Sequence, residues 1–162
     1  MNTVKEYVTK INENGNNYLD EVSEHPCDSA LTDPKKCMDF INHAFDASHL
    51  SEEHFYAIAT DTKSNPIAVF DIAHGTVDGA YIQPREVLIR LLLSGASAAL
   101  LIHNHPSGCP TPSKDDFHIT KELHAAFELI GIKLLDHIII GRDTYYSFCE
   151  NALVNSRTAI DK

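Results

Sequence analysis

Apolar residues recur at intervals of three and four in three stretches of the chain, and each stretch predicts an amphipathic helix. The first covers residues 35–46, directly after a proline at position 34 that suits a first helical turn. The second opens at Pro84 and ends near Gly95. The third begins at Ser113, a good N-cap, and stops at Gly131.

Between these helices lie stretches with the composition of strands. Residues 53–60 and 67–73 flank a polar turn and predict a β-hairpin. Residues 98–102 are continuously apolar, as in a central strand covered on both faces, and residues 132–140 and 144–148 predict a closing pair. Because strands and helices are interleaved, the expected fold class is α/β, with a mixed β-sheet sandwiched by helices.

The first 34 residues are more polar than the rest and contain the run Asn14-Gly15-Asn16-Asn17. This composition predicts a weak helix followed by a loop, without candidate chemistry. The expected organisation is therefore an N-terminal extension over residues 1–34, one domain over residues 35–150, and a C-terminal tail over residues 151–162.

Composition narrows the class of protein. The length of 162 residues with 43% hydrophobic content suits one domain with a substantial core. No uncharged apolar run is long enough to span a membrane, and the polar start lacks the apolar segment of a signal peptide, so we expect a soluble, cytoplasmic protein. Four scattered cysteines without a C-x-x-C pair indicate reduced thiols, and a net charge of −10 disfavours strong direct DNA binding.

The segment from His103 to Asp116 carries the candidate chemistry. On an extended backbone, His103 and His105 point to the same side of the strand end. Prolines and a glycine then restrict the turn to Ser113, which can form a capping box with Asp116 in the first turn of the helix. Two imidazoles and a carboxylate suit one Zn²⁺ and leave a fourth position for water, whose pKa falls to about 7 on the metal. The segment therefore predicts zinc-dependent hydrolysis.

The same residues allow other interpretations. An isolated H-x-H pair is as compatible with a structural loop as with metal binding, and it is the combination with Ser113 and Asp116 that favours a metal site. The tripeptide His103-Asn104-His105 is not the signature of an HNH nuclease, which uses separated residues. Asp115 competes with Asp116, but the spacing to Ser113 selects Asp116, and Asp115 suits the helix dipole.

The residues His103, His105, Ser113 and Asp116 meet the pattern H-x-H-x₇-S-x₂-D, and the chain thereby resembles the JAB/JAMM zinc metallopeptidases. The wider sequence is similar to RadC proteins over roughly residues 35–150. That similarity rests on five further segments: Gly75-Thr76, Pro84-Arg85-Glu86, His103-Asn-His-Pro-Ser-Gly108, Pro112-Ser113 and Asp136-His137-Ile-Ile-Ile-Gly141.

The resemblance implies a fold similar to JAMM domains and cytidine deaminases, and one zinc per chain. It also implies attack of zinc-bound water on an amide or isopeptide carbonyl of a peptide or protein substrate. The family glutamate that moves the proton is matched by Glu53, with Glu52 and Glu86 as alternatives. Ser113 is similar to the serine that helps to hold the oxyanion.

Two departures from RadC proteins qualify this expectation. Cys109 stands where their loop often has aspartate, and their N-terminal helix-hairpin-helix region is not recognisable. His137, beside Asp136, has two interpretations: it orients another group near the metal, or it holds a loop, which we favour. The second function considered is a non-catalytic binding module associated with DNA repair or mobile-element processing.

Overall fold

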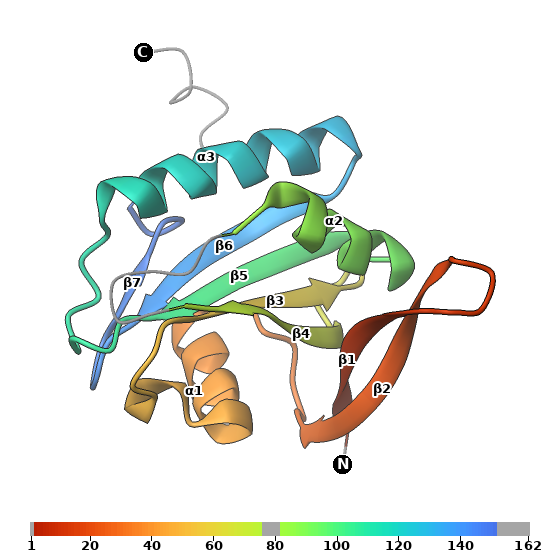
Figure 1. Ribbon diagram of the computed structural model, residues 1–162. Coiled ribbons are helices and arrows are strands. Elements are labelled where there is room, and N and C mark those ends of the chain that lie inside the picture. The colour runs from red at the N-terminus through yellow and green to blue at the C-terminus, as the bar shows by residue number, and fades with distance from the viewer. Residues whose placement is uncertain (1, 76–81, 152–162) are drawn as a thin grey trace.

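The computed structural model describes residues 2–75 and 82–151, in which three helices and a short 3₁₀ helix pack on a seven-stranded sheet (Figure 1). The helices are α1 (Pro34–Phe45), η1 (Ala47–His49), α2 (Pro84–Leu93) and α3 (Lys114–Leu129). The strands are β1 (Thr3–Ile11), β2 (Asn17–Pro26), β3 (His54–Thr60), β4 (Pro66–His74), β5 (Ala98–Asn104), β6 (Lys133–Ile140) and β7 (Tyr145–Ser147).

The sheet has the order β2-β1-β4-β3-β5-β6-β7 and is mixed. One of its central strands is β5, which pairs antiparallel with β3 and parallel with β6. Every residue of β5 is buried, which explains its uninterrupted apolar sequence up to His103. The predicted fold class, a mixed sheet between helices, is confirmed.

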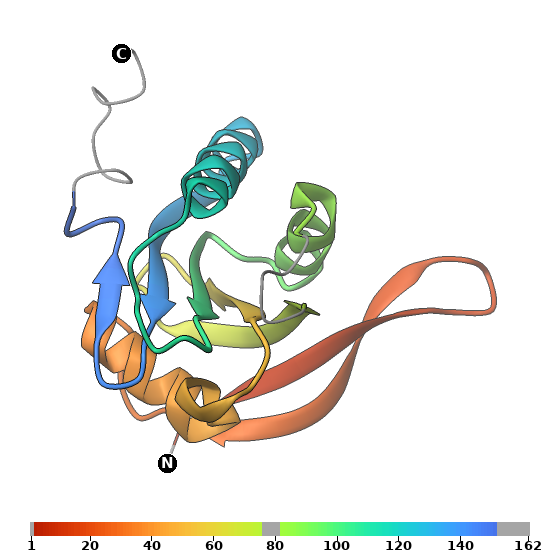
Figure 2. The same cartoon turned by 60° about the vertical axis from the view of Figure 1, so that its left-hand side comes forward.

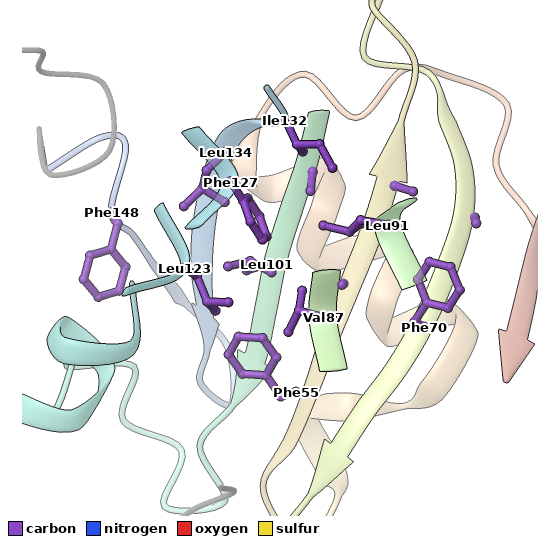
Figure 3. Close-up of a cluster of buried hydrophobic side chains, with 14 of the residues drawn as sticks. Phe55, Phe70, Val87, Leu91, Leu101, Leu123, Phe127, Ile132, Leu134 and Phe148 are labelled. Atoms are coloured by element: carbon purple, nitrogen blue, oxygen red, sulfur yellow. The ribbon is translucent and has the colours of Figure 1, made fainter. Parts of the chain in front are cut away.

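Helices cover both faces of the sheet, with α2 and α3 on one side and α1 on the other (Figure 2). Under α2 and α3, Val87, Leu91, Leu123 and Phe127 converge on Leu101 of the central strand (Figure 3). On the opposite face, buried side chains of α1 pack against β3, β5 and β6 in a second cluster. These two cores fix the strand ends that carry the candidate site.

The N-terminal segment differs from its prediction, because the weak helix and loop expected there are wrong. The chain forms the β1–β2 hairpin instead, with a turn in which Gly15 has a φ of 80°. Regular alternation along β1 places Val4 under α1 and Tyr7 against the other core, and the bulge lies on the partner strand β2, where Val22 is the extra residue. Strand β1 also pairs with β4, so the hairpin extends the main sheet.

The other predicted helices and strands are confirmed to within a few residues. Thr76 of the predicted motif lies outside the described residues, as does the predicted tail beyond Asn151. No helix in the described ranges has the length and apolar character needed to cross a membrane.

Candidate metal centre

Two histidines predicted as metal ligands lie at the carboxyl end of the central strand. His103 is the second-last residue of β5, and His105 follows directly after the strand. Their Nε2 atoms are 3.1 Å apart, as expected for rings two residues apart on extended backbone. The His103 side chain is 4% exposed and stacks on Phe55 of β3, with ring centroids 5.8 Å apart. Packing therefore holds one ring rigidly before any metal binds.

Asp116 reaches the same point from the first turn of α3. The predicted capping box is present: Asp116 donates its backbone N–H to Ser113 Oγ, and its Oδ2 accepts from the Ser113 N–H at 2.7 Å. Asp116 Oδ1 lies 3.1 Å from His103 Nε2, and Oδ2 lies 3.5 Å from His105 Nε2. Local helix capping thus aims the carboxylate at both rings.

The donor set fits a small divalent cation. His103, His105 and Asp116 each present one ligand atom, and these atoms all lie within 4.8 Å of one another. In a tetrahedron with metal–ligand distances near 2.0–2.1 Å, neighbouring ligand atoms are about 3.3 Å apart. The separations of 3.1 to 3.5 Å therefore match the spacing that zinc requires.

Charges at the cluster also favour a cation. Burial alone would raise the pKa of the Asp116 carboxyl, but the adjoining rings of His103 and His105 hold it well below its usual range. Burial lowers the pKa of His105, yet Asp116 and the backbone carbonyl of Cys109 outweigh that effect and raise it overall. The cluster thus holds an ionised carboxylate and attracts a positive charge to the space between the three side chains.

The loop after β5 is anchored to the end of β6. The His105 N–H donates to the carbonyl of Ile140 at 2.9 Å, and the Arg142 N–H donates to the carbonyl of Gly108 at 3.1 Å. His105 Nδ1 lies 2.9 Å from the carbonyl oxygen of Cys109, which can only accept. This contact leaves Nε2 of His105 available to a metal.

A second set of contacts lies behind His103, away from the cleft. His103 Nδ1 is 2.8 Å from Nε2 of His137, and His137 Nδ1 is 2.6 Å from Thr120 Oγ1. The adjacent Asp136 carboxylate is committed elsewhere, to Ser147 Oγ and to the backbone N–H groups of His137 and Cys149. Sequence reasoning favoured a loop-holding role for His137, whereas its ring contacts a predicted ligand directly.

Glu53, the predicted proton carrier, precedes β3 and lines the same cleft as the cluster. Two residues further along the chain, Phe55 pairs with His103, and the charge of Glu53 contributes to raising the pKa of His105. Asn104 fixes this segment: its amide accepts from the His54 N–H at 2.8 Å and donates to the Glu52 carbonyl at 3.0 Å. The role of Asn104 is absent from the sequence prediction, because only strand pairing brings it to Glu53.

The alternative carboxylates lie in other surroundings. Glu52 is half-exposed, with its Oε2 4.0 Å from His74 Nδ1. Glu86 pairs with Arg85 at 2.8 Å and with Arg90 at 3.4 Å. Asp115 is exposed at the start of α3 and lines the cleft without joining the three-donor cluster. Within the described residues, Glu53 is thus the glutamate that shares the cleft with the cluster and adjoins β3.

The cluster opens into a cleft of about 1200 Å³. Ser113 lines it, and because its Oγ accepts the Asp116 N–H, its own hydroxyl hydrogen is free to point into the cleft. Cys109 is exposed, and its thiol lies 3.3 Å from Thr111 Oγ1, a contact that lowers the pKa of the thiol. The cleft is lined on its other sides by Phe55, Ile82, Pro84, Ile119 and Glu122.

Comparison with known proteins gives a consistent picture. A family described as the RadC-like JAB domain matches residues 31–153. The chain is 36% identical over 129 residues to a UPF0758 protein of Coprothermobacter proteolyticus, covering 78% of this chain and 55% of that protein. It is 39% identical over 124 residues to a UPF0758 protein of Clostridium acetobutylicum, covering 76% and 53%. The chain thus spans about half the length of the curated relatives it matches.

Proposed function

The chain belongs to the family of RadC-like JAB domains, and on that premise we propose that it is a zinc-dependent hydrolase that cleaves amide or isopeptide bonds in a peptide or protein. One observation carries the proposal: three metal-ligating side chains converge at zinc spacing, at the wall of an open cleft that also contains a glutamate. Hydrolysis needs a polarising cation, a proton carrier and room for a substrate, and this arrangement supplies a place for each.

His103, His105 and Asp116 would hold the ion, which suits Zn²⁺ because two imidazoles and one carboxylate are its usual catalytic ligand set. When bound, zinc supplies Lewis acidity and lowers the pKa of a water to about 7. These three side chains lie at the wall of the cleft, while His137 lies behind His103 and away from it, so the ion would be accessible to substrate from the cleft.

Glu53 would take a proton from the attacking water and return it to the leaving amine. Its backbone is well suited to such a role, because Asn104 binds the peptide groups on both sides of it and the Gly75 N–H donates to its carbonyl at 2.8 Å. A general base with a fixed backbone loses little entropy when its carboxylate adopts the reactive geometry.

Ser113 would stabilise the developing oxyanion. Its Oγ is held by the Asp116 N–H, and its hydroxyl hydrogen is the one group of that side chain left to donate to a substrate oxygen. A donor already oriented by helix capping requires little rearrangement in the transition state. Mutational loss of one such donor typically costs about 10²–10³ in kcat.

The proposal is tested with Glu53→Gln, which preserves shape and removes the carboxylate. We expect a zinc content of about one per chain, as in the wild type, with hydrolysis of a lysine-isopeptide and peptide library lost. Glu52→Gln, one residue away and half-exposed, is the matched control and keeps activity. His103→Ala and Asp116→Ala should lose the zinc.

Two results would oppose the proposal in different ways. Full activity in Glu53→Gln removes Glu53 from the mechanism, and equal zinc in the wild type and both ligand variants removes the metal site. A zinc-loaded wild type that hydrolyses no member of the library favours the alternative, a non-catalytic binding module. The net charge of −10 does not favour DNA as the partner of such a module.

A further inference from the structure

We propose that His137 and Thr120 are positioning residues, which fix the tautomer of His103 and thereby present the lone pair of its Nε2 to the metal. The inference rests on the proposed metal site, but not on hydrolysis. It concerns two fully buried polar side chains, one on β6 and one on α3, that have no direct access to the cleft.

The direction of each hydrogen bond in the series His103–His137–Thr120 follows from the contact of Thr120 with a backbone carbonyl. Thr120 Oγ1 lies 2.5 Å from the backbone carbonyl of Asp116, one turn earlier in α3. A carbonyl oxygen only accepts, so the single hydroxyl hydrogen of Thr120 points to it. Toward His137 the same hydroxyl can therefore act only as an acceptor.

This requirement determines the state of His137. Its Nδ1, 2.6 Å from Thr120 Oγ1, must carry a hydrogen. The ring is 0% exposed and its two nitrogens contact His103 and Thr120 rather than a carboxylate, so an unpaired buried charge is avoided, the ring is neutral and its Nε2 is bare. Asp136 offers no alternative partner to this ring, because its carboxylate bonds to Ser147 and to backbone groups.

The bare Nε2 of His137 accepts from His103, whose Nδ1 lies 2.8 Å away and so carries a hydrogen. With that hydrogen on Nδ1, the nitrogen that presents a lone pair to a metal is Nε2, which faces His105 and Asp116. The relay thus runs from the Asp116 carbonyl through Thr120 and His137 to His103, and ends beside the Asp116 carboxylate.

The tautomers of His103 and His105 are fixed by different groups. His105 donates from Nδ1 to the carbonyl of Cys109, which has only one possible direction. His103 faces another histidine, which can donate or accept at either nitrogen. A third group is needed to remove that ambiguity, and Thr120 supplies it.

The closing experiment combines zinc affinity with ring tautomers. In Thr120→Val the hydroxyl is lost at nearly constant volume, His137 can turn its hydrogen to Nε2, and zinc binding should weaken by about 10- to 100-fold in chelator competition. Thr120→Ser keeps the hydroxyl and should bind zinc as the wild type does. Thr60→Val is the matched control, because Thr60 is 0% exposed and its hydroxyl has no hydrogen-bond partner among residues 2–75 and 82–151.

Histidine ring ¹⁵N spectra of the metal-free wild type give a readout that does not depend on zinc or on folding of a variant. We expect His137 to carry its hydrogen on Nδ1, and a hydrogen on Nε2 would overturn the proposal. Zinc affinity of Thr120→Val within twofold of Thr60→Val would also overturn it, since a merely structural threonine changes stability alone. A wild type that binds no zinc refutes the proposed function, while the tautomer of His137 still decides the relay.

Discussion

Replacing Gly141 with alanine adds a methyl group where the loop after β5 passes closest to the end of β6. An ideal Cβ on Gly141 would lie 2.6 Å from the carbonyl oxygen of Gly108 and 2.9 Å from Cδ of Pro110. Both neighbours belong to the loop that carries His105 and the carbonyl accepting from it. The substitution therefore tests whether this close approach keeps the metal ligands in place.

The size of the effect follows from the contact distances. Ordinary contacts of a Cβ begin at 3.4 Å, so the Gly108 carbonyl must move by about 0.8 Å. Such overpacking costs about 1–3 kcal/mol of folding stability. The neighbouring Cys109 carbonyl moves with it, which lengthens the hydrogen bond from Nδ1 of His105. Loss of such a bond to a metal-ligating histidine typically weakens metal affinity by about 10- to 100-fold, and we expect zinc binding to weaken by about tenfold here.

Zinc affinity by chelator competition and thermal unfolding with and without zinc measure the two effects. Gly95→Ala is the control: its φ of 70° makes alanine strained, yet no described residue beyond its chain neighbours lies within 4 Å of the added Cβ. It should lower stability by about 1 kcal/mol and leave zinc affinity unchanged. The reasoning is refuted if Gly141→Ala binds zinc as tightly as Gly95→Ala does.

Three further outcomes are expected. The pKa of His105 is raised overall, and its ring must be deprotonated to bind a metal. Zinc affinity should therefore be full above that pKa and fall by about tenfold per pH unit below it. A zinc affinity that does not change from pH 5 to 8 would contradict this. Free zinc at a hundredfold excess over its Kd should stabilise the fold by about 2.7 kcal/mol, or about 5–10 °C in Tm, with no shift in His103→Ala. Asn104→Ala should lower kcat by roughly tenfold with zinc affinity retained, because the backbone around Glu53 loses two hydrogen bonds; reduced zinc content would instead assign Asn104 to the metal site.

The sequence was informative where local patterns and tertiary structure agree. The apolar run of β5, the helical stripes and the capping box of Ser113 and Asp116 each reflect short-range chemistry, so their prediction needed no knowledge of strand order. The convergence of His103, His105 and Asp116 could be predicted for the same reason. The three residues are close in the sequence, and one strand end, one loop and one helix start bring them together.

The N-terminal hairpin was mispredicted for a physical reason. Val4, Tyr7, Val8 and Ile11 have the spacing of a helical stripe, although they belong to a strand that places Val4 in one core and Tyr7 against the other. Pairing with β4, some sixty residues along the chain, decides its conformation. The Asn14-Gly15 pair was the local signal of a hairpin that the polar composition obscured.

The contacts of Asn104, Thr120 and His137 depend on tertiary geometry and could not be predicted in the same way. Thr120 has helical spacing with the buried face of α3, which predicts packing and not a hydrogen bond to His137. His137 reaches His103 only through the parallel pairing of β5 and β6, whose register no local pattern specifies.

The capping box gives Asp116 a place in the architecture that does not depend on the ion. The Ser113 N–H, the first turn of α3 and the carboxylate are tied together whether or not a cation lies between the histidines. Small zinc-finger domains unfold when their metal is removed, because the bonds between metal and ligands hold the fold together. In this chain the capping box holds the Asp116 carboxylate in position without a metal. For the proposed zinc site we therefore expect metal binding and release to be local events at a strand end, with little change in heat capacity and without unfolding of the chain.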